Sequence, residues 1–198
     1  GGAIYYINLS QDSYKLGGSS FAQILSKIGS EAPDITNSEF FLTAFNAIQD
    51  LIKAGKVKAG HDVGSGGLIT TLLEMCFAEL NTGAKLDLTA LGEADIIKLL
   101  FSENIAVVLQ GDASIETELR KKNIEFFKIG SVSNEATLEL INASETYKFD
   151  VSALRDTWFK TSYLLDQQQS GVKKATERFN NYKKQPLQYN FPEQFTGK

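Results

Sequence analysis

The sequence predicts an α/β protein of the α+β type, in which helices are layered on a mixed β-sheet. Segments with strand-like patterns alternate with segments that have helical spacing of apolar residues, in the order βααβαβαβαββαα. This alternation favours a layered α/β domain. Two strand-like segments follow each other around Asn134, which favours a mixed sheet over a purely parallel one. Apolar residues make up 42% of the 198 residues, enough for a buried core.

The first expected elements are one strand and two helices. Residues 3–9, AIYYINL, are β-branched and aromatic and predict a strand. Ser19 and Ser20 open a helix that is expected to end at Gly29. A capping box of Thr36 and Glu39 starts the next helix, which is expected to end at Gly55. Helical spacing places one set of apolar residues on the inward face of this second helix: Phe41, Ala44, Phe45, Ile48, Leu51 and Ile52.

The remaining elements follow from the same patterns. Residues 57–63 predict a short strand that runs into a glycine turn, and a helix is expected from Gly67 to about Leu80. The continuous apolar run 105–111 predicts a central strand. Asp112 is the expected N-cap of the helix after it. The other expected elements are a strand at 84–91, helices at 93–103 and 112–123, strands at 124–132 and 136–142, and helices at 151–169 and 172–184.

Composition excludes several classes of function. The net charge is −4 with no block of like charge, which disfavours binding to nucleic acid. No apolar run approaches the ~20 residues needed to span a bilayer, and no signal peptide is visible, so no membrane partner is expected. The single cysteine, Cys76, excludes an internal disulfide and suits the reducing cytoplasm. One histidine and one cysteine exclude a zinc cluster of the usual ligand types.

The two ends of the sequence predict a piece of a longer protein. The chain opens with Gly1-Gly2 and no initiator Met, and its last residues are aromatic and contain proline but have no periodicity. We therefore expect one domain over residues 1–184 and a connector over residues 185–198. A cloning scar and an ordinary frayed tail are the alternative.

The stretch AGHDVGSGGL, residues 59–68, is the first candidate site. A strand ends there, glycines allow a ligand to approach the backbone, and a helix N-terminus offers free N–H groups to an anion. Asp62 could hold a divalent cation that bridges phosphates. The stretch lacks the Gly-Lys-Ser/Thr ending of a P-loop and the spacing of a dinucleotide fingerprint. A tight turn in which Asp62 caps the helix is an equally good interpretation.

The loop LGGSS, residues 16–20, repeats this chemistry. Ser19 and Ser20 could bind a phosphate or cap the helix, and capping is the commoner use. His61 is expected to be a partly buried structural residue with a hydrogen-bonded ring, and Cys76 a core residue. Trp158 and Phe159 are expected to pack the long helix onto the sheet. The basic residues near the end are expected to form a solvated helical face: Lys173, Lys174, Arg178, Lys183 and Lys184.

Four stretches, in this order and spacing, resemble one family. They are LGGSSFAQIL, PDI, AGHDVGSGGLITTLLEMCFAE and LFSENIAVVLQ. Together they resemble the C-terminal AIR-synthetase-type domain in the second half of the large, single-chain phosphoribosylformylglycinamidine synthases. The most specific part is HD-x-x-x-GGL-x-x-x-LLEM-x-FA, and the resemblance covers nearly the whole chain.

This resemblance implies an AIR synthetase C-terminal-domain-like fold and a role in an ATP-dependent ligase of purine biosynthesis. Such an enzyme converts formylglycinamide ribonucleotide to the amidine, with ammonia from glutamine. Its synthetase part is an internal duplication, and one nucleotide site, holding ATP or ADP with Mg²⁺, has a mainly structural role. The chain would contribute to that auxiliary site, together with a preceding domain, and would be inactive alone. Residues 185–198 resemble the linker to the glutaminase domain, so the implied partners are that domain and the other synthetase domains.

The resemblance also assigns residues. Asp62 matches the magnesium-ligand aspartate of the family motif HD-R-S-D-GG, and Gly66 and Gly67 match its glycine pair. Gly64 stands where the family has a serine that contacts the nucleotide, and Ser65 stands where it has an aspartate. The loop of Gly17, Gly18, Ser19 and Ser20 resembles one that handles substrate phosphate in the catalytic half of these enzymes.

Two other interpretations remain open from the sequence. The departures at Gly64 and Ser65 suit a purely structural interaction module whose ligand site has decayed. Alternatively, the chain is the C-terminal domain of another AIR-synthetase-like ATP-dependent enzyme. Glutamine hydrolysis within this chain is excluded because no activated cysteine has a partner histidine.

Overall fold

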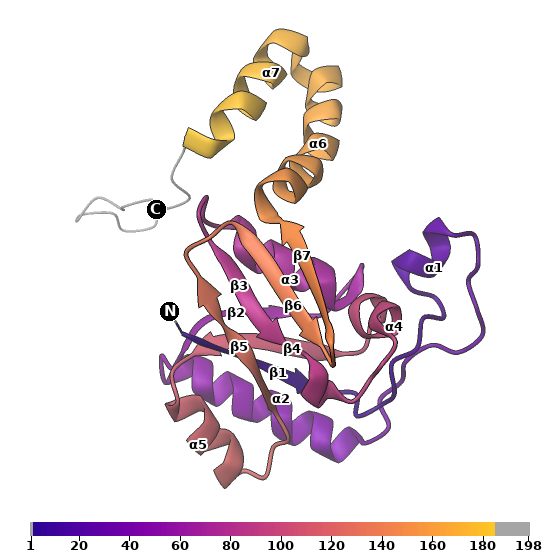
Figure 1. Cartoon of the computed structure of the whole chain (residues 1–198), viewed down its shortest axis with the longest axis vertical. Helices are drawn as coiled ribbons and strands as arrows, with labels where there is room; N and C mark the ends of the chain where they lie inside the picture. Colours follow the sequence, from indigo (N-terminus) through magenta and orange to yellow (C-terminus); the bar gives the residue numbers. More distant parts are fainter. Residues whose placement is uncertain (1, 185–198) are drawn as a thin grey trace, which may run out of the picture.

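The computed structural model describes residues 2–184, so the expected connector at 185–198 lies outside the described residues. Within these residues, seven strands form one sheet in the order β2-β4-β1-β5-β3-β6-β7 (Figure 1). Every pair of neighbouring strands is antiparallel except β3 and β6, so the predicted mixed sheet is confirmed. The strands are β1 (Ala3–Asn8), β2 (Val57–Asp62), β3 (Gly83–Asp87), β4 (Ala106–Gly111), β5 (Phe127–Ser133), β6 (Thr137–Asn142) and β7 (Glu145–Asp150).

Helices cover both faces of the sheet, and a two-helix hairpin projects from one end (Figure 1). The helices are α1 (Ser20–Ile24), α2 (Ser38–Lys53), α3 (Gly67–Phe77), α4 (Ile96–Phe101), α5 (Ser114–Lys121), α6 (Val151–Ser170) and α7 (Val172–Asn181). Short 3-10 helices lie between β3 and α4, at Thr89–Leu91, and after α7, at Tyr182–Lys184. Among the described residues, none of these helices combines the length and the apolar character that a membrane crossing requires.

The core has two halves because side chains of a strand point alternately to opposite faces. In β1, Ile4 and Tyr6 pack into the half that also contains α3 and α4, whereas Tyr5 and Ile7 pack into the half that contains α2 and α5. Strand β4 lies between β1 and β2, as its continuous apolar sequence predicts. This two-sided burial explains why the central strands contain so few polar residues.

The starts and ends of the first two helices differ from expectation. Helix α1 ends at Ile24 rather than Gly29, because Ser26 adopts a positive φ of 55° and the N–H of Lys27 bonds to the carbonyl of Ala22. The predicted capping box at Thr36 is wrong. Asn37 caps α2 by accepting a bond from the N–H of Phe40, while the Thr36 hydroxyl donates to the carbonyl of Ser10.

Several helix boundaries and faces also shift. On α2, Ala44, Ile48 and Leu51 are buried as expected, but Phe45 and Ile52 are exposed. Helix α3 ends at Phe77, before the expected Leu80. Helix α5 begins at Ser114, and Ala113 rather than the expected Asp112 is its N-cap residue, although the Asp112 carboxylate still accepts a bond from the N–H of Ser114.

The sheet contains one strand that the sequence patterns did not predict. Strand β7 is a mostly exposed edge strand in which only Tyr147 and Phe149 pack against the core, and an alternation of two apolar residues is a weak signal. The expected strand 84–91 ends early, at Asp87, whose carboxylate accepts a bond from the N–H of Thr89 and starts a 3-10 turn. Strands β5 and β6 are consecutive, as expected, but β3 lies between them.

The α6–α7 hairpin packs mainly against α3, with a smaller contact to β6 and β7, and its two aromatic residues contact α3 and the hairpin rather than the sheet, so the expectation for them is wrong. Trp158 contacts Phe77, with 5.9 Å between the ring centroids. Phe159 stacks on Tyr182 at 4.2 Å, inside the hairpin itself. The five basic residues of α7 and its end are exposed, which confirms the predicted solvated face.

Candidate functional site

Asp62 is the last residue of β2, and its carboxylate faces solvent. The side chain is 85% exposed. Its backbone, by contrast, is held in place, because the Thr71 hydroxyl donates to the Asp62 carbonyl at 3.0 Å and the N–H of Val63 donates to the carbonyl of Ala106 at 2.8 Å. A fixed backbone that presents an exposed carboxylate is suited to binding a cation from outside the chain.

His61 is a structural neighbour of Asp62, as expected. Its Nδ1 lies 2.6 Å from the Asp62 carbonyl oxygen, and its Nε2 lies 3.0 Å from a carboxylate oxygen of Glu74. The other oxygen of Glu74 accepts a bond from the indole N–H of Trp158 at 3.0 Å. The imidazole ring is therefore held between β2 and α3, and through Glu74 it is connected to α6.

The backbone conformation of the turn 64–67 requires glycine at positions 66 and 67, where α3 begins. Gly66 and Gly67 have positive φ values of 90° and 75°, which L side chains rarely adopt. A Cβ on Gly67 would lie 2.6 Å from the carbonyl oxygen of Leu100, so α3 begins in direct contact with the end of α4. Gly66, which has no side chain, is the N-cap residue, and within residues 2–184 the Asp62 carboxylate accepts no bond from an N–H group at the start of α3, so the interpretation of Asp62 as a helix cap is wrong.

The backbone N–H groups of residues 17–20 donate hydrogen bonds to other groups of the same chain. The N–H groups of Gly17, Gly18 and Ser19 donate to the carbonyls of Glu31, Ile28 and Leu16. The buried Ser19 hydroxyl accepts a bond from the N–H of Ala22 and donates to the carbonyl of Leu16. Ser19 is therefore the N-cap of α1, which is the commoner of the two uses considered for it.

Glu103 joins the two candidate loops, and the sequence patterns did not single it out. One of its oxygens, Oε1, accepts bonds from the N–H of Ser20 and the N–H of Gly66, both at 2.8 Å. Partial burial acts to raise the pKa of Glu103, but the bonds from these N–H groups and from the Ser20 hydroxyl outweigh it and hold the pKa below its ordinary value. In the sequence, the only indication was a glutamate that directly follows a predicted helix, in LFSEN. Its hydrogen-bond partners are distant in sequence and become neighbours only through the fold.

Asp62 by itself supplies only one of the several ligands that a bound metal ion needs. Among residues 2–184, no group of three His, Cys, Asp or Glu side chains lies close enough together to hold a metal ion. Asp62 is therefore not part of a complete set of such side chains within these residues. Cys76 is buried in the core, as expected, and burial raises the pKa of its thiol to about 11.

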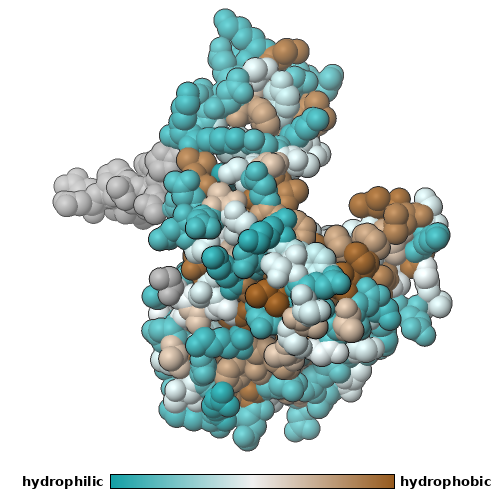
Figure 2. Space-filling model, viewed as in Figure 1, coloured by the Kyte–Doolittle hydropathy of each residue, from teal (hydrophilic) through white to brown (hydrophobic). Residues whose placement is uncertain are grey.

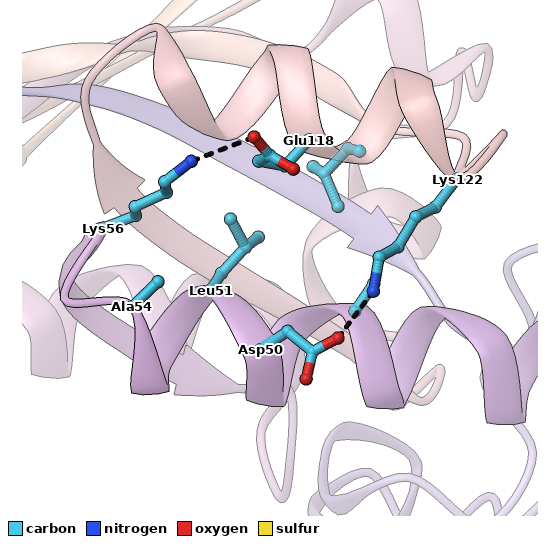
Figure 3. Close-up of a pocket in the computed structure, with 8 residues that line it drawn as sticks. Asp50, Leu51, Ala54, Lys56, Glu118 and Lys122 are labelled. Atoms are coloured by element: carbon cyan, nitrogen blue, oxygen red, sulfur yellow. Dashed lines mark hydrogen bonds and ion pairs between the residues drawn. The ribbon is translucent and has the colours of Figure 1, made fainter.

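A separate pocket of about 240 Å³ lies between α2 and α5 (Figure 3). Two ion pairs cross it: Lys56 with Glu118 at 3.0 Å, and Lys122 with Asp50 at 2.6 Å. Each lysine is thus paired with a carboxylate of the same pocket, and both pairs connect the α2 side of the pocket with the α5 side. None of the residues predicted from the sequence as ligands lines this pocket.

Comparison with known proteins gives a family and two informative relatives. Residues 1–141 match the family described as AIR synthase related protein, C-terminal domain. The chain is 35% identical over 174 residues to a probable phosphoribosylformylglycinamidine synthase, chloroplastic/mitochondrial, of Arabidopsis thaliana, and 31% identical over 177 residues to the phosphoribosylformylglycinamidine synthase of Homo sapiens. Each alignment covers 85% of this chain, but only 12% and 13% of the two relatives.

Solved structures share the fold. The PurL protein of Thermotoga maritima complexed with FGAR superposes with a TM-score of 0.58 and 17% identity, covering 78% of this chain and 28% of that protein. The same protein complexed with ATP gives a TM-score of 0.56 and 19% identity, over 78% and 26% of the two chains. Together with the match over residues 1–141, these results show that the chain belongs to the family of AIR synthase related proteins, as their C-terminal domain.

Proposed function

We propose that this chain is one domain of a phosphoribosylformylglycinamidine synthase and that it contributes Asp62 and the turn 64–67 to an auxiliary Mg²⁺–nucleotide site. The exposed Asp62 carboxylate on its fixed backbone is the observation that carries the proposal. The names of the Arabidopsis and human relatives support the enzyme class. The descriptions of Thermotoga PurL complexed with ATP, with ADP and with FGAR support a nucleotide-binding protein.

The proposed enzyme joins nitrogen from glutamine to formylglycinamide ribonucleotide at the expense of ATP. In this proposal the chain does not carry the reacting groups and is inactive by itself. Its partners are the other synthetase domains and a glutaminase domain, with residues 1–184 as the domain and residues 185–198 as the linker toward the glutaminase. We propose a cytoplasmic location, and the organellar description of the Arabidopsis relative provides the alternative.

The residues present fit one side of a Mg²⁺–nucleotide site. An ionised carboxylate is a ligand that Mg²⁺ prefers, and Mg²⁺ there would neutralise charge on the nucleotide phosphates. Gly64 and Ser65 are exposed beside Asp62, and the structure gives no partner for their N–H groups within residues 2–184. These two N–H groups are the proposed phosphate contacts. Gly66, Gly67, Gly17, Gly18, Ser19 and Ser20 shape the backbone around them.

Replacement of Asp62 tests this proposal in the complete enzyme. Asp62→Asn removes the negative charge of an exposed side chain, so we expect an unchanged fold but loss of copurifying ADP and Mg²⁺. Nucleotide released on denaturation and metal content would be measured together. Asp34→Asn, at another exposed aspartate, is the matched control.

An unchanged nucleotide and metal content in Asp62→Asn would instead favour the second candidate, an interaction module with a decayed site. The observation that favours this alternative is the absence of a hydroxyl at Gly64 and of a carboxylate at Ser65. Turnover of ATP and formylglycinamide ribonucleotide by the isolated chain would contradict both candidates.

Gly64→Ser is expected to strengthen the auxiliary site. A Cβ at Gly64 meets only the Asp62 carboxylate, at 4.0 Å, so a serine side chain has room there. Its hydroxyl would add a hydrogen bond to a charged ligand, and we expect nucleotide affinity to rise by about ten-fold. Calorimetric titration of the complete enzyme with Mg²⁺–ADP measures this. Gly64→Ala is the control, and an equal gain from alanine would contradict a role for the hydroxyl.

A further inference from the structure

Glu103 connects two segments that are distant in sequence. Ser20 begins α1 and Gly66 is the N-cap of α3, and both N–H groups donate to the same carboxylate oxygen at 2.8 Å. A charged acceptor shared by two backbone donors is stronger than a neutral one. Through this one side chain, the position of the first loop depends on the position of the second.

Packing at the same place brings three helices together. Phe21 of α1 stacks on Phe101 of α4, with ring centroids 4.6 Å apart, and Figure 1 shows α1 beside α4. Gly67, at the start of α3, leaves no space for a Cβ next to Leu100 and Phe101. Glu103 follows α4 by two residues, so its carboxylate lies where the starts of α1 and α3 meet the end of α4.

Glu103 also occupies the position that an anion would take at the start of α3. The first N–H groups of a helix attract negative charge, and here a carboxylate of the chain itself accepts the bond from Gly66. The N–H groups of Gly17, Gly18 and Ser19 bond to carbonyls of the chain. The Asp62 carboxylate and the turn residues Gly64 and Ser65, by contrast, are exposed to solvent.

We propose that Glu103 is a positioning residue that holds segments 17–20 and 64–67 together as one composite surface. In doing so it fills the anion position at Gly66 and leaves contact with the ligand to Asp62, Gly64 and Ser65. The assignment of a ligand rests on the proposed function, whereas the connection between the two loops does not. A phosphate group is therefore excluded from the N–H groups of Ser20 and Gly66.

Hydrogen exchange in this chain tests the connection. Glu103→Ala removes the acceptor, so the amides of Ser20 and Gly66 are expected to exchange about ten-fold faster or more, with Glu103→Gln intermediate. The amides of Ala22 and Val63 lie nearby in sequence but bond to other acceptors, so their exchange should stay unchanged. Glu125→Ala, at an exposed glutamate, is the matched control. A change at only one of the two amides, or an equal change at all four, would overturn the proposal.

Two measurements complete the test. In the unmodified chain, NMR couplings across the hydrogen bonds should connect the amide nitrogens of Ser20 and Gly66 to the carboxyl carbon of Glu103, and their absence would overturn the proposal even if the variants failed to fold. Inorganic phosphate should shift the Ser20 and Gly66 amide signals in Glu103→Ala but not in the unmodified chain. Shifts in the unmodified chain would show that phosphate displaces Glu103 and would overturn the proposal. None of these readouts needs Mg²⁺ or nucleotide, so a failure here is separate from a failure of the Asp62→Asn experiment.

Discussion

Gly67→Ala is expected to lower the free energy of unfolding by about 2–5 kcal/mol. Gly67 has a positive φ of 75°, and an alanine in this conformation costs roughly 1–2 kcal/mol. The new Cβ would also lie 2.6 Å from the carbonyl oxygen of Leu100 and 2.8 Å from Cα of Phe101, and overpacking of this kind adds about 1–3 kcal/mol. Both atoms belong to the backbone of α4, so the clash can be relieved only if one helix moves.

Denaturant unfolding of the unmodified chain and of Gly67→Ala measures this difference. The comparison requires that the slope of the free energy of unfolding against denaturant concentration is the same in both. Gly64→Ala is the matched control, because Gly64 belongs to the same turn but has open space around it. We expect the control to change the free energy of unfolding by less than ~0.5 kcal/mol. Equal effects of the two substitutions would show that the contact between α3 and α4 does not require glycine.

Arg155→Ala is expected to lower the free energy of unfolding by about 2–4 kcal/mol and to loosen the α6–α7 hairpin. Arg155 is 2% exposed, and its guanidinium donates to the carbonyls of Phe77, the last residue of α3, and of Glu79, two residues beyond it. A cation is favourable at the C-terminal end of a helix, where carbonyl groups lack partners. The substitution would leave those carbonyls unpaired and a gap between α3 and α6.

Hydrogen exchange along α6 and α7 measures the loosening, and denaturant unfolding measures the loss of stability. The control is Arg178→Ala, because Arg178 pairs with Asp166 inside the hairpin but is largely exposed. Exposed ion pairs are screened by solvent and contribute little. If Arg178→Ala destabilised the chain as much as Arg155→Ala, the proposed attachment through the end of α3 would be wrong.

Periodicity and local signals were sufficient for most of the elements. The expected strands and helices all exist, because their apolar residues recur with the spacing that burial on one or both sides requires. The failures lie where local signals compete or are weak. Thr36 and Asn37 are both good N-cap residues, and the contact of Thr36 with Ser10, far away in sequence, decided between them. Strand β7 lies at the sheet edge and has only two apolar residues, Tyr147 and Phe149, so its alternation is too short to be a strong signal.

The candidate turn was found from its glycines and its aspartate, and the family from the longer motif. The sequence left open whether Asp62 caps α3, and whether Ser19 caps α1 or faces a ligand. The structure decided both points, because a cap is defined by a hydrogen bond to a particular N–H group: Ser19 makes that bond and Asp62 does not. His61 and Cys76 have the structural and core positions expected from their surroundings.

The sequence by itself determined the class of fold, the position of the strand-to-helix turn and the family, since these follow from local patterns of residues. Only the tertiary structure decided that the turn 64–67 and the loop 17–20 lie together, that Glu103 accepts from both, and that Asp62 remains open to solvent. The physical reason is that a shared hydrogen bond depends on how α1, α3 and α4 pack. No spacing within a single segment contains that information.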